Sequence, residues 1–334
     1  MTSKFWIRRL RLGVVLALTA AAHVGAHAAG TVGTTFPTGF PVIEDASLKK
    51  PVIGFGAAGV VTRTPVIFLH GNNDTPFATA CAPYGRMQAM AQYLADNGYA
   101  TSELWGLGYE GDQCDLAADP PRRSSIAHTN QANVPDLRRF VAAVLAYTGA
   151  RQVDIVGHSL GVTLAREWMR QDEASAKVRR LVAIDGPNHG IINCSPLAAN
   201  YWQLPSLGGF TPSSEVCQEL GSPDTPFLKL LNGRGEHEET EGRTRVLVIR
   251  NADTSFVYFP LQDGVLSPVP AVDSYGKPTD FSRSATLKGV KQIDLTGQGI
   301  YDPILGSTHL GILNSPQTRQ ATLEFLTERR HGRH

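Results

Sequence analysis

The stretch VDIVGHSLGVTLAREWMRQ at residues 153–171 decides the fold. It opens with a short, mostly apolar run typical of a buried strand, passes through Gly157-His158-Ser159-Leu160-Gly161, and continues with helical spacing. A G-x-S-x-G sequence between a strand and a helix is typical of a sharp turn that exposes its serine. Glycine flanks the serine because a Cβ would crowd the turn. The pattern therefore predicts that Ser159 is a nucleophile.

The chain around this stretch alternates between strand-like and helix-like segments. Short apolar runs predict strands, and apolar residues at helical spacing predict helices between them. Mostly apolar strands suit a parallel sheet that is covered on both faces. We therefore expect an α/β fold with a mostly parallel central sheet and helices on both faces. The clearest strands are at 64–71, 153–157, 181–184 and 246–249, and the clearest helices are at 85–97, 133–147 and 315–330.

Composition limits the classes of function. Of 334 residues, 42% are hydrophobic and 18% are charged, so the chain can bury a large core. The 31 Lys and Arg residues nearly balance the 30 Asp and Glu residues, giving a net charge of +1. No strongly basic field is present to attract nucleic acid, and we expect no nucleic-acid partner.

The amino terminus predicts export. Residues 1–13 carry four basic residues and no acid, an apolar run follows, and Ala26-His27-Ala28 ends it. This order is typical of a secretory signal peptide. We expect residues 1–28 to be removed after Ala28, leaving 29–334 as a secreted or periplasmic domain without a membrane span.

Four cysteines agree with an oxidising compartment. They allow three pairings. Sequence order favours Cys81 with Cys114 and Cys194 with Cys217, although the other pairings stay open. No C-x-x-C pair and no Cys/His cluster with zinc spacing occurs, so we expect no metal.

A serine nucleophile needs a base, and an acid that orients the base. Where the serine lies on such a turn, the histidine follows the acid along the chain. His309, in GSTHLGILNSP before the last expected helix, fits the base, whereas His158 and His189 suit structural roles. Asp253, shortly after the strand at 245–250, is the preferred acid, and Asp263 is its rival.

Backbone N–H groups are expected to stabilise the oxyanion. One belongs to Leu160, which follows the nucleophile. The other belongs to Asn72 in LHGNN, where His70-Gly71 lets the chain turn sharply after a strand.

Two long stretches, 191–242 and 259–285, interrupt the alternation. Loops of this length inside a compact domain are often lids or binding loops. The first contains an apolar group, from which Trp202 and Phe210 are predicted to contact substrate. Alternatively, the whole group packs inward and holds the loop down. The group comprises Tyr201, Trp202, Leu204 and Phe210.

These motifs together resemble the α/β-hydrolase superfamily, and within it the bacterial and fungal lipases. The HG loop, the GHSxG turn, GPNHG at 186–190 and the STHLGIL ending carry the resemblance, which covers most of the chain after residue 28. GPNHG is similar to a stretch of class 2 lipases, and STHLGIL to the histidine loop of small lidless lipases. The order of motifs is also similar to an extracellular poly(3-hydroxybutyrate) depolymerase.

The resemblance implies a serine ester hydrolase with residues Ser159, Asp253 and His309. We expect a secreted lipase or esterase that works through an acyl-enzyme without a cofactor. Its substrate would be a lipid, a small ester or a polyester, and it would act as a monomer. A polyhydroxyalkanoate depolymerase is the alternative, and a catalytically silent binding protein of the same fold is a third hypothesis.

Overall fold

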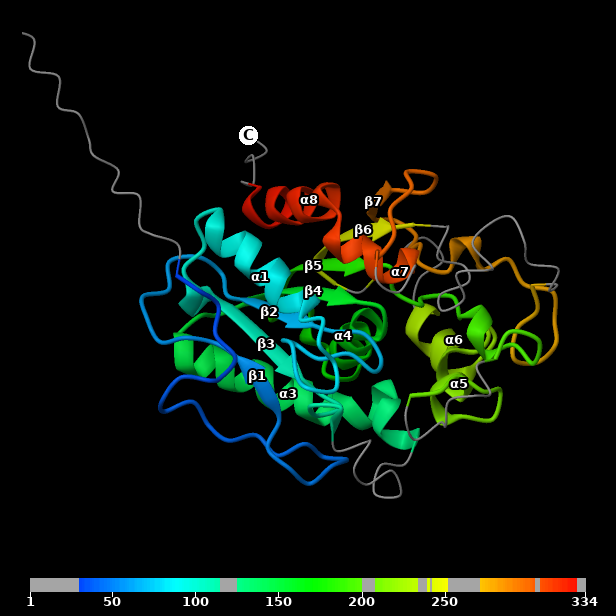
Figure 1. The fold of residues 1–334 in the computed structure, drawn as a ribbon, viewed down its shortest axis with the longest axis horizontal. Coiled ribbons are helices and arrows are strands. Elements are labelled where there is room, and N and C mark those ends of the chain that lie inside the picture. The colour runs from blue at the N-terminus through cyan, green and yellow to red at the C-terminus, as the bar shows by residue number, and fades with distance from the viewer. Residues whose placement is uncertain are drawn as a thin grey trace, which may run out of the picture.

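A seven-stranded sheet forms the centre of the computed structural model, which describes residues 30–114, 125–199, 208–233, 239–240, 242–251, 271–303 and 307–328. The strand order is β1-β3-β2-β4-β5-β6-β7, with β1 antiparallel to β3 and every other neighbouring pair parallel (Figure 1). The predicted mostly parallel sheet is confirmed. The strands are β1 (Ile53–Phe55), β2 (Val66–Leu69), β3 (Leu104–Gly108), β4 (Val153–His158), β5 (Val178–Ile184), β6 (Arg245–Arg250) and β7 (Lys291–Asp294).

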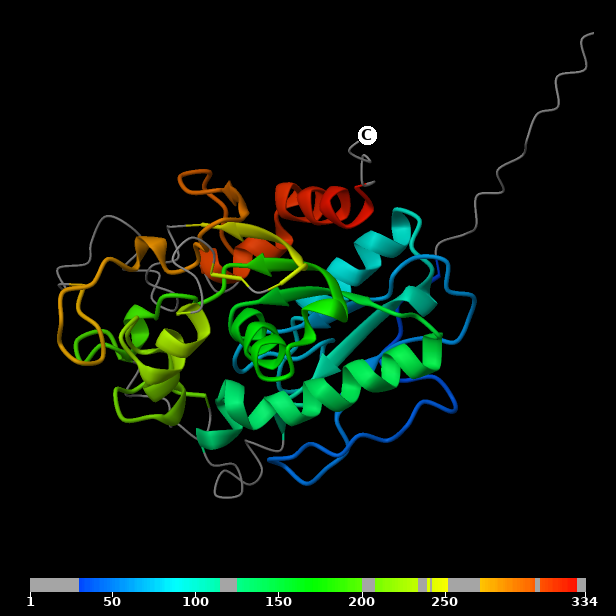
Figure 2. The ribbon, with the colours of Figure 1, turned by 180° about the vertical axis from the view of Figure 1, so that it is seen from behind.

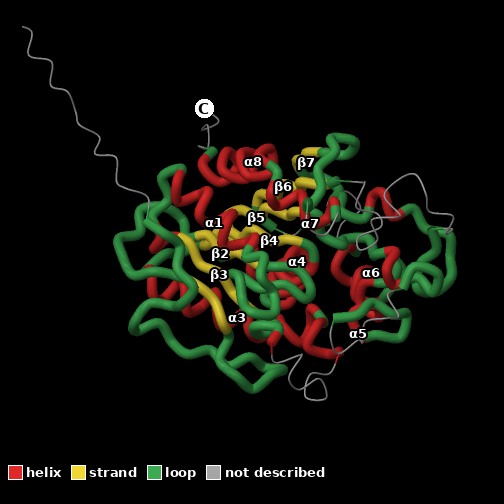
Figure 3. The backbone as a smooth tube through the Cα atoms, in the orientation of Figure 1, coloured by secondary structure: helices red, strands yellow, loops and turns green. Residues whose placement is uncertain are grey.

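Helices cover both faces of this sheet, as the sequence predicts (Figure 3). Helices α1 and α8 pack on one face, while α3 and α4 run along the other, where the view from behind shows them side by side (Figure 2). The shorter α5 and α6 come from the 191–242 region. The helices are α1 (Arg86–Asp96), α3 (Asn130–Thr148), α4 (Leu160–Gln171), α5 (Glu215–Leu220), α6 (Pro226–Asn232), α7 (Thr308–Gly311) and α8 (Pro316–Thr327).

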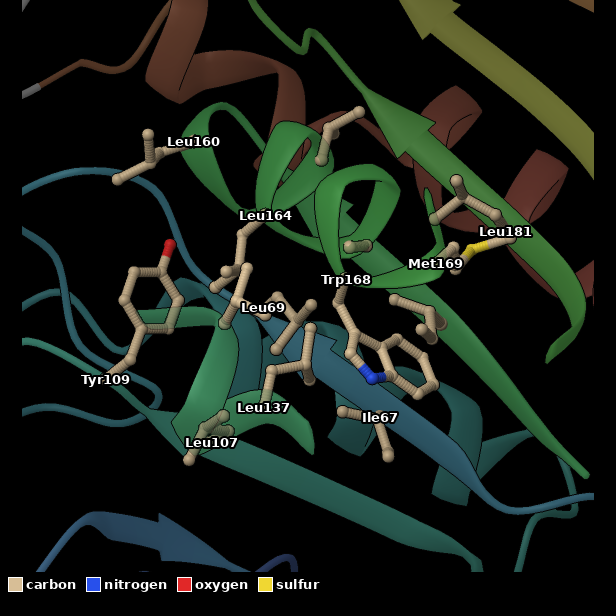
Figure 4. Packing of buried hydrophobic residues seen from close by; sticks show 14 of the residues in the cluster. Ile67, Leu69, Leu107, Tyr109, Leu137, Leu160, Leu164, Trp168, Met169 and Leu181 are labelled. Atoms are coloured by element: carbon tan, nitrogen blue, oxygen red, sulfur yellow. The ribbon is translucent and has the colours of Figure 1, made fainter. Parts of the chain in front are cut away.

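The core is divided by the sheet because successive strand residues point to opposite faces. In β2, Ile67 and Leu69 belong to the cluster under α3 and α4, whereas Val66 and Phe68 belong to the cluster under α1 and α8. Trp168 of α4 is buried over Ile67 (Figure 4). Burial on both faces explains why these strands are apolar along their whole length.

Local signals set the ends of the long helices. Gly149 ends α3 in the left-handed conformation, with φ 68°, which glycine adopts without steric cost. The hydroxyl of Ser315 accepts from the N–H of Thr318 at the start of α8, where Pro316 occupies the first turn. These signals fix where α3 ends before β4 and where α8 begins.

Several predicted features lie outside the described residues. These are the signal peptide at 1–28, the acid candidates Asp253 and Asp263, and Tyr201, Trp202 and Leu204. In the described part of the chain, no helix combines the length and apolar composition needed to cross a bilayer.

Candidate active site

Ser159 stands at the point where β4 turns into α4. Its backbone adopts φ 52° and ψ −124°, a strained conformation for a residue with a side chain. A Cβ on Gly157 would lie 2.9 Å from the carbonyl oxygen of Gly161, and a Cβ on Gly161 would lie 2.5 Å from that of Leu69. Both glycines are therefore required by close backbone approach. The sharp turn predicted around Ser159 is present.

His309 pairs with a carboxylate that the sequence analysis did not consider. Its Nδ1 lies 2.7 Å from Oδ2 of Asp185, and both side chains are almost completely buried. Asp185 directly follows β5, as Ser159 follows β4, so parallel neighbouring strands deliver both residues to the same edge of the sheet. The preferred acid, Asp253, lies outside the described residues. Among the described residues, Asp185 is a carboxylate in direct contact with Nδ1 of His309.

The conformation of Asp185 is held by the neighbouring strand. Its N–H donates to the carbonyl of Ile249, and its Oδ1 accepts from the N–H of Asn251 at 3.3 Å. Its φ of 48° again departs from the usual range for a residue with a side chain. A hint was present in the sequence, because IDGPNHG places an acid at the end of a confident strand.

His158 is buried and contacts His309. Its Nε2 lies 2.9 Å from the carbonyl oxygen of His309, and the two rings are 4.5 Å apart. Burial, followed by the nearby His309, lowers the pKa of His158 well below its ordinary value of 6.5. A neutral His158 therefore donates from Nε2 to the His309 backbone. The structural role expected for His189 fits its contacts with Ser284 and Glu239.

A pocket of about 600 Å³ that opens to solvent joins these groups. Ser159, His309 and Asp185 line it together with Asn72 and Leu160, the two residues predicted to supply oxyanion donors. Leu160 is the first residue of α4, so its N–H belongs to the helix end that carries partial positive charge. These five residues therefore line one cavity.

The rest of the pocket wall is mainly apolar and comes largely from the 191–242 region and from 281–285. Phe210, one of the two predicted substrate contacts, is part of this wall, and α5 contributes two more apolar side chains. Such a wall suits the acyl part of an ester. The apolar lining includes Ile191, Phe210, Val216, Leu220, Phe281 and Ala285.

The predicted disulfide pairing is confirmed. Cys81 is bonded to Cys114, and Cys194 to Cys217. The second bond fastens α5 to the segment that follows β5. Within the described ranges, no three His, Cys, Asp or Glu side chains are grouped as metal ligands.

Comparison with known protein families shows to which family this chain belongs. The family model for class 2 lipases matches residues 63–244, which is more than half of the chain and includes Asn72, Ser159 and Asp185. The chain belongs to the class 2 lipase family. It is a carboxylic ester hydrolase of the lipolytic type.

A solved structure of a bacterial lipase agrees with this class 2 lipase at the level of the fold. Lipase BlEst2 of Bacillus licheniformis, in its mature form, is 18% identical over 82% of this chain and 97% of its own, with a TM-score of 0.51. Lipase B of Aspergillus fumigatus is 18% identical over 79% of this chain, with a TM-score of 0.47. The chain spans about half of that fungal protein, 52% of its length.

Proposed function

We propose that this class 2 lipase hydrolyses carboxylic esters through an acyl-enzyme formed on Ser159, with His309 as base and Asp185 as orienting acid. The observation that carries the proposal is the 2.7 Å contact between His309 Nδ1 and Asp185, in the cavity that Ser159 also lines. A carboxylate on Nδ1 fixes the tautomer in which Nε2 accepts a proton.

The reaction follows from these positions. Ser159 Oγ attacks the ester carbonyl while its proton passes to Nε2 of His309. The backbone N–H groups of Leu160 and Asn72 bind the oxyanion that forms. Collapse of the tetrahedral intermediate breaks the bond to the alcohol, which leaves with the proton from His309. Water then attacks the acyl-enzyme by the same route and releases the acid and free Ser159.

Asp185 is preferred to Asp253 because the former contacts the base directly. Its carboxylate is also anchored through Asn251 and its backbone through Ile249, so the imidazole is held by a rigid part of the sheet. Asp253, which the sequence favours because it follows the strand at 245–250, is the alternative acid.

A serine-reactive phosphonate tests the proposal. The wild-type protein should become covalently labelled on Ser159, as located by mass spectrometry of its peptides, and Ser159→Ala should remain unlabelled. Absence of label on the folded wild-type protein would favour a silent binding protein of the same fold. Label on another serine would move the nucleophile.

A substrate panel tests the lipase and polyester alternatives. The apolar lining of the pocket, with Phe210 and the α5 side chains, favours esters with an apolar acyl group. The panel compares p-nitrophenyl esters of increasing chain length, tributyrin and amorphous polyhydroxybutyrate granules. Preferential hydrolysis of the granules would favour a depolymerase.

We also propose that the enzyme is exported and acts as a monomer in which the 191–242 region forms part of the substrate-binding wall. Two disulfides support an oxidising compartment. Amino-terminal sequencing of protein from the medium or periplasm should begin after Ala28, and light scattering of the same material should give the mass of one chain.

A further inference from the structure

Two buried ionisable side chains contact the turn that carries Asn72 without lining the pocket. Glu110 follows β3, and His128 ends a short helical turn before α3. Both side chains are fully buried, and His128 Nδ1 lies 3.2 Å from Glu110 Oε2. Burying such groups is costly unless hydrogen bonds compensate, so their partners indicate what the pair does.

The first partner is the turn that carries Asn72. The N–H of Asp74 donates to the carbonyl of Gly71, which closes a tight turn over four residues. Asn73 lies in the left-handed region, with φ 57°, and its N–H donates to Glu110 Oε2 at 2.9 Å. Left-handed backbone persists in a residue with a side chain only where the surroundings enforce it. Glu110 supplies such a contact.

The second partner is the Asn72 side chain. Its Nδ2 donates to the carbonyl oxygen of Gly208 at 3.0 Å, which fixes its amide orientation, and its Oδ1 lies 3.1 Å from His128 Nδ1. Both neighbours of Nδ1, Asn72 Oδ1 and Glu110 Oε2, are acceptors. His128 must therefore donate from Nδ1.

Gly208, which belongs to the 191–242 region, packs against the turn that carries Asn72. It has φ 76°, and a Cβ there would lie 3.1 Å from Asn73 Cβ and 3.3 Å from His128 Cε1. Two residues later along the chain, Phe210 lines the pocket. The turn that bears Asn72 is therefore packed between the Glu110–His128 pair and the base of the substrate wall.

We infer that Glu110 and His128 are positioning residues for the oxyanion site, and that they aim the N–H of Asn72 by holding its turn and docking Gly208 onto it. The inference rests on the proposed function, because it assumes that Asn72 binds the oxyanion. Neither residue lines the pocket. Loss of the pair should therefore weaken binding of the transition state more than binding of the substrate.

Two substitutions of His128 separate hydrogen bonding from packing. The amide nitrogen of asparagine falls near the position of Nδ1, whereas that of glutamine falls near Nε2. His128→Asn should therefore keep the donor to Asn72, and His128→Gln should lose it. Glu110→Gln removes the charge from the other member of the pair at nearly constant volume.

The matched control is Glu103→Gln. Glu103 is a fully buried carboxylate before the same strand, at the opposite edge of the sheet, and it also accepts from loop N–H groups. It should share any general effect of removing a buried carboxylate while leaving the oxyanion site unaltered. Melting temperatures of all four variants report folding.

The measurement compares substrate KM with the inhibition constant of an alkyl trifluoromethyl ketone, whose hemiketal with Ser159 carries an oxyanion. Glu110→Gln and His128→Gln should lower kcat and weaken the ketone about tenfold to a hundredfold, with KM changed at most about twofold. His128→Asn and Glu103→Gln should stay within about threefold of the wild-type protein in both quantities.

Several outcomes would overturn the inference. They are unchanged ketone affinity in folded Glu110→Gln and His128→Gln, equal losses in Glu103→Gln, or losses confined to KM. If neither pair variant folds, Gly208→Ala probes the contact from the other side and should weaken the ketone in the same way, and unaltered affinity would again overturn it. A wild-type protein that neither hydrolyses esters nor binds the ketone would instead reject the proposed function.

Discussion

A fully buried glutamate lies near each end of strand β3, and the two glutamates differ in what they contact. Before the strand, Glu103 accepts from the N–H groups of Thr62 and Arg63, both at 2.7 Å, and from Ala100 at 3.0 Å. After the strand, Glu110 accepts from the N–H of Asn73 and lies beside His128, which also contacts Asn72. The first carboxylate fastens a loop, whereas the second fastens a turn that faces the pocket.

The difference extends across the sheet. At the carboxyl edge, the segments leaving four successive strands contain a residue other than glycine with a positive φ: Asn73 after β2, Glu110 after β3, Ser159 after β4 and Asp185 after β5. Each such conformation costs on the order of 1–3 kcal/mol and must be enforced by neighbours. The backbone conformations at the carboxyl edge therefore lower the free energy of unfolding in order to position side chains. Contacts such as those of Glu103 at the amino edge raise the free energy of unfolding.

Removing the nucleophile should have the largest effect on the carboxyl edge. Ser159→Ala deletes the attacking oxygen without altering the backbone, so we expect kcat to fall by about 10⁴ or more with little change in melting temperature. Ester hydrolysis at saturating substrate provides the measurement. Retention of a tenth of the activity would place the nucleophile elsewhere and remove the reason for strain at this turn.

The next largest effect should come from the acid. Asp185→Asn keeps the shape but favours the wrong tautomer of His309, and we expect kcat to fall by on the order of 10⁴. Asp253→Asn should cost at most a few-fold if Asp185 is the acid. The reverse ranking of the two variants would restore Asp253 and leave Asp185 as a structural residue.

Reduction of the disulfides should destabilise the carboxyl edge of the sheet more than the amino edge. Both bonds join segments on the carboxyl side, and their sequence separations are 33 and 23. Loops of this size correspond to about 3 kcal/mol each in the chain-entropy model. Dithiothreitol should lower the melting temperature and raise amide exchange near Cys81 and Cys194 more than near Glu103. Uniform exchange throughout the sheet would contradict a difference between the edges.

The smallest effect concerns Glu219, which accepts from the N–H groups of Asn130 and Gln131 at the start of α3. Burial raises its pKa from the ordinary 4.5 to about 7. A raised pKa in the folded state means that stability is fully present below the unfolded pKa and is lost as pH rises through the folded pKa. Relative to Glu219→Gln, wild-type melting temperature should therefore decline between pH 4.5 and about 7. Parallel curves for the two proteins would contradict this titration.

The sequence predicted the parts of the site that local patterns encode. The Ser159 turn needs glycines at fixed spacing, and the predicted helix at 85–97 corresponds to α1 because its apolar spacing is unambiguous. His309 was predicted as the base because it precedes the final expected helix, and that role stays a prediction. The small, marginal strands β1 and β7 were missed, since three or four residues with little apolar pattern carry no usable period.

The parts of the candidate site that the sequence analysis missed depend on contacts between segments that are distant in the sequence. Asp185 and His309 are 124 residues apart, and chain order alone allows an acid after more than one strand. Helix α3 begins at Asn130 rather than near 133 because the Thr129 side chain accepts from Ala132 and Glu219 from the first turn. The Glu110–His128–Asn72 cluster similarly joins three separate segments, and of these only the segment with Asn72 carries a motif.

The hydrogen bond from His158 to the His309 carbonyl ties the proposed base to the strand end that carries Ser159, the proposed nucleophile. His158 precedes Ser159 on the same rigid strand end, and its ring holds the backbone of the base at 2.9 Å. A displacement of this strand end would therefore carry nucleophile and base together. Because the chemistry depends on the separation of these groups rather than on their absolute position, the arrangement should tolerate thermal motion and amino-acid drift in the surrounding sheet.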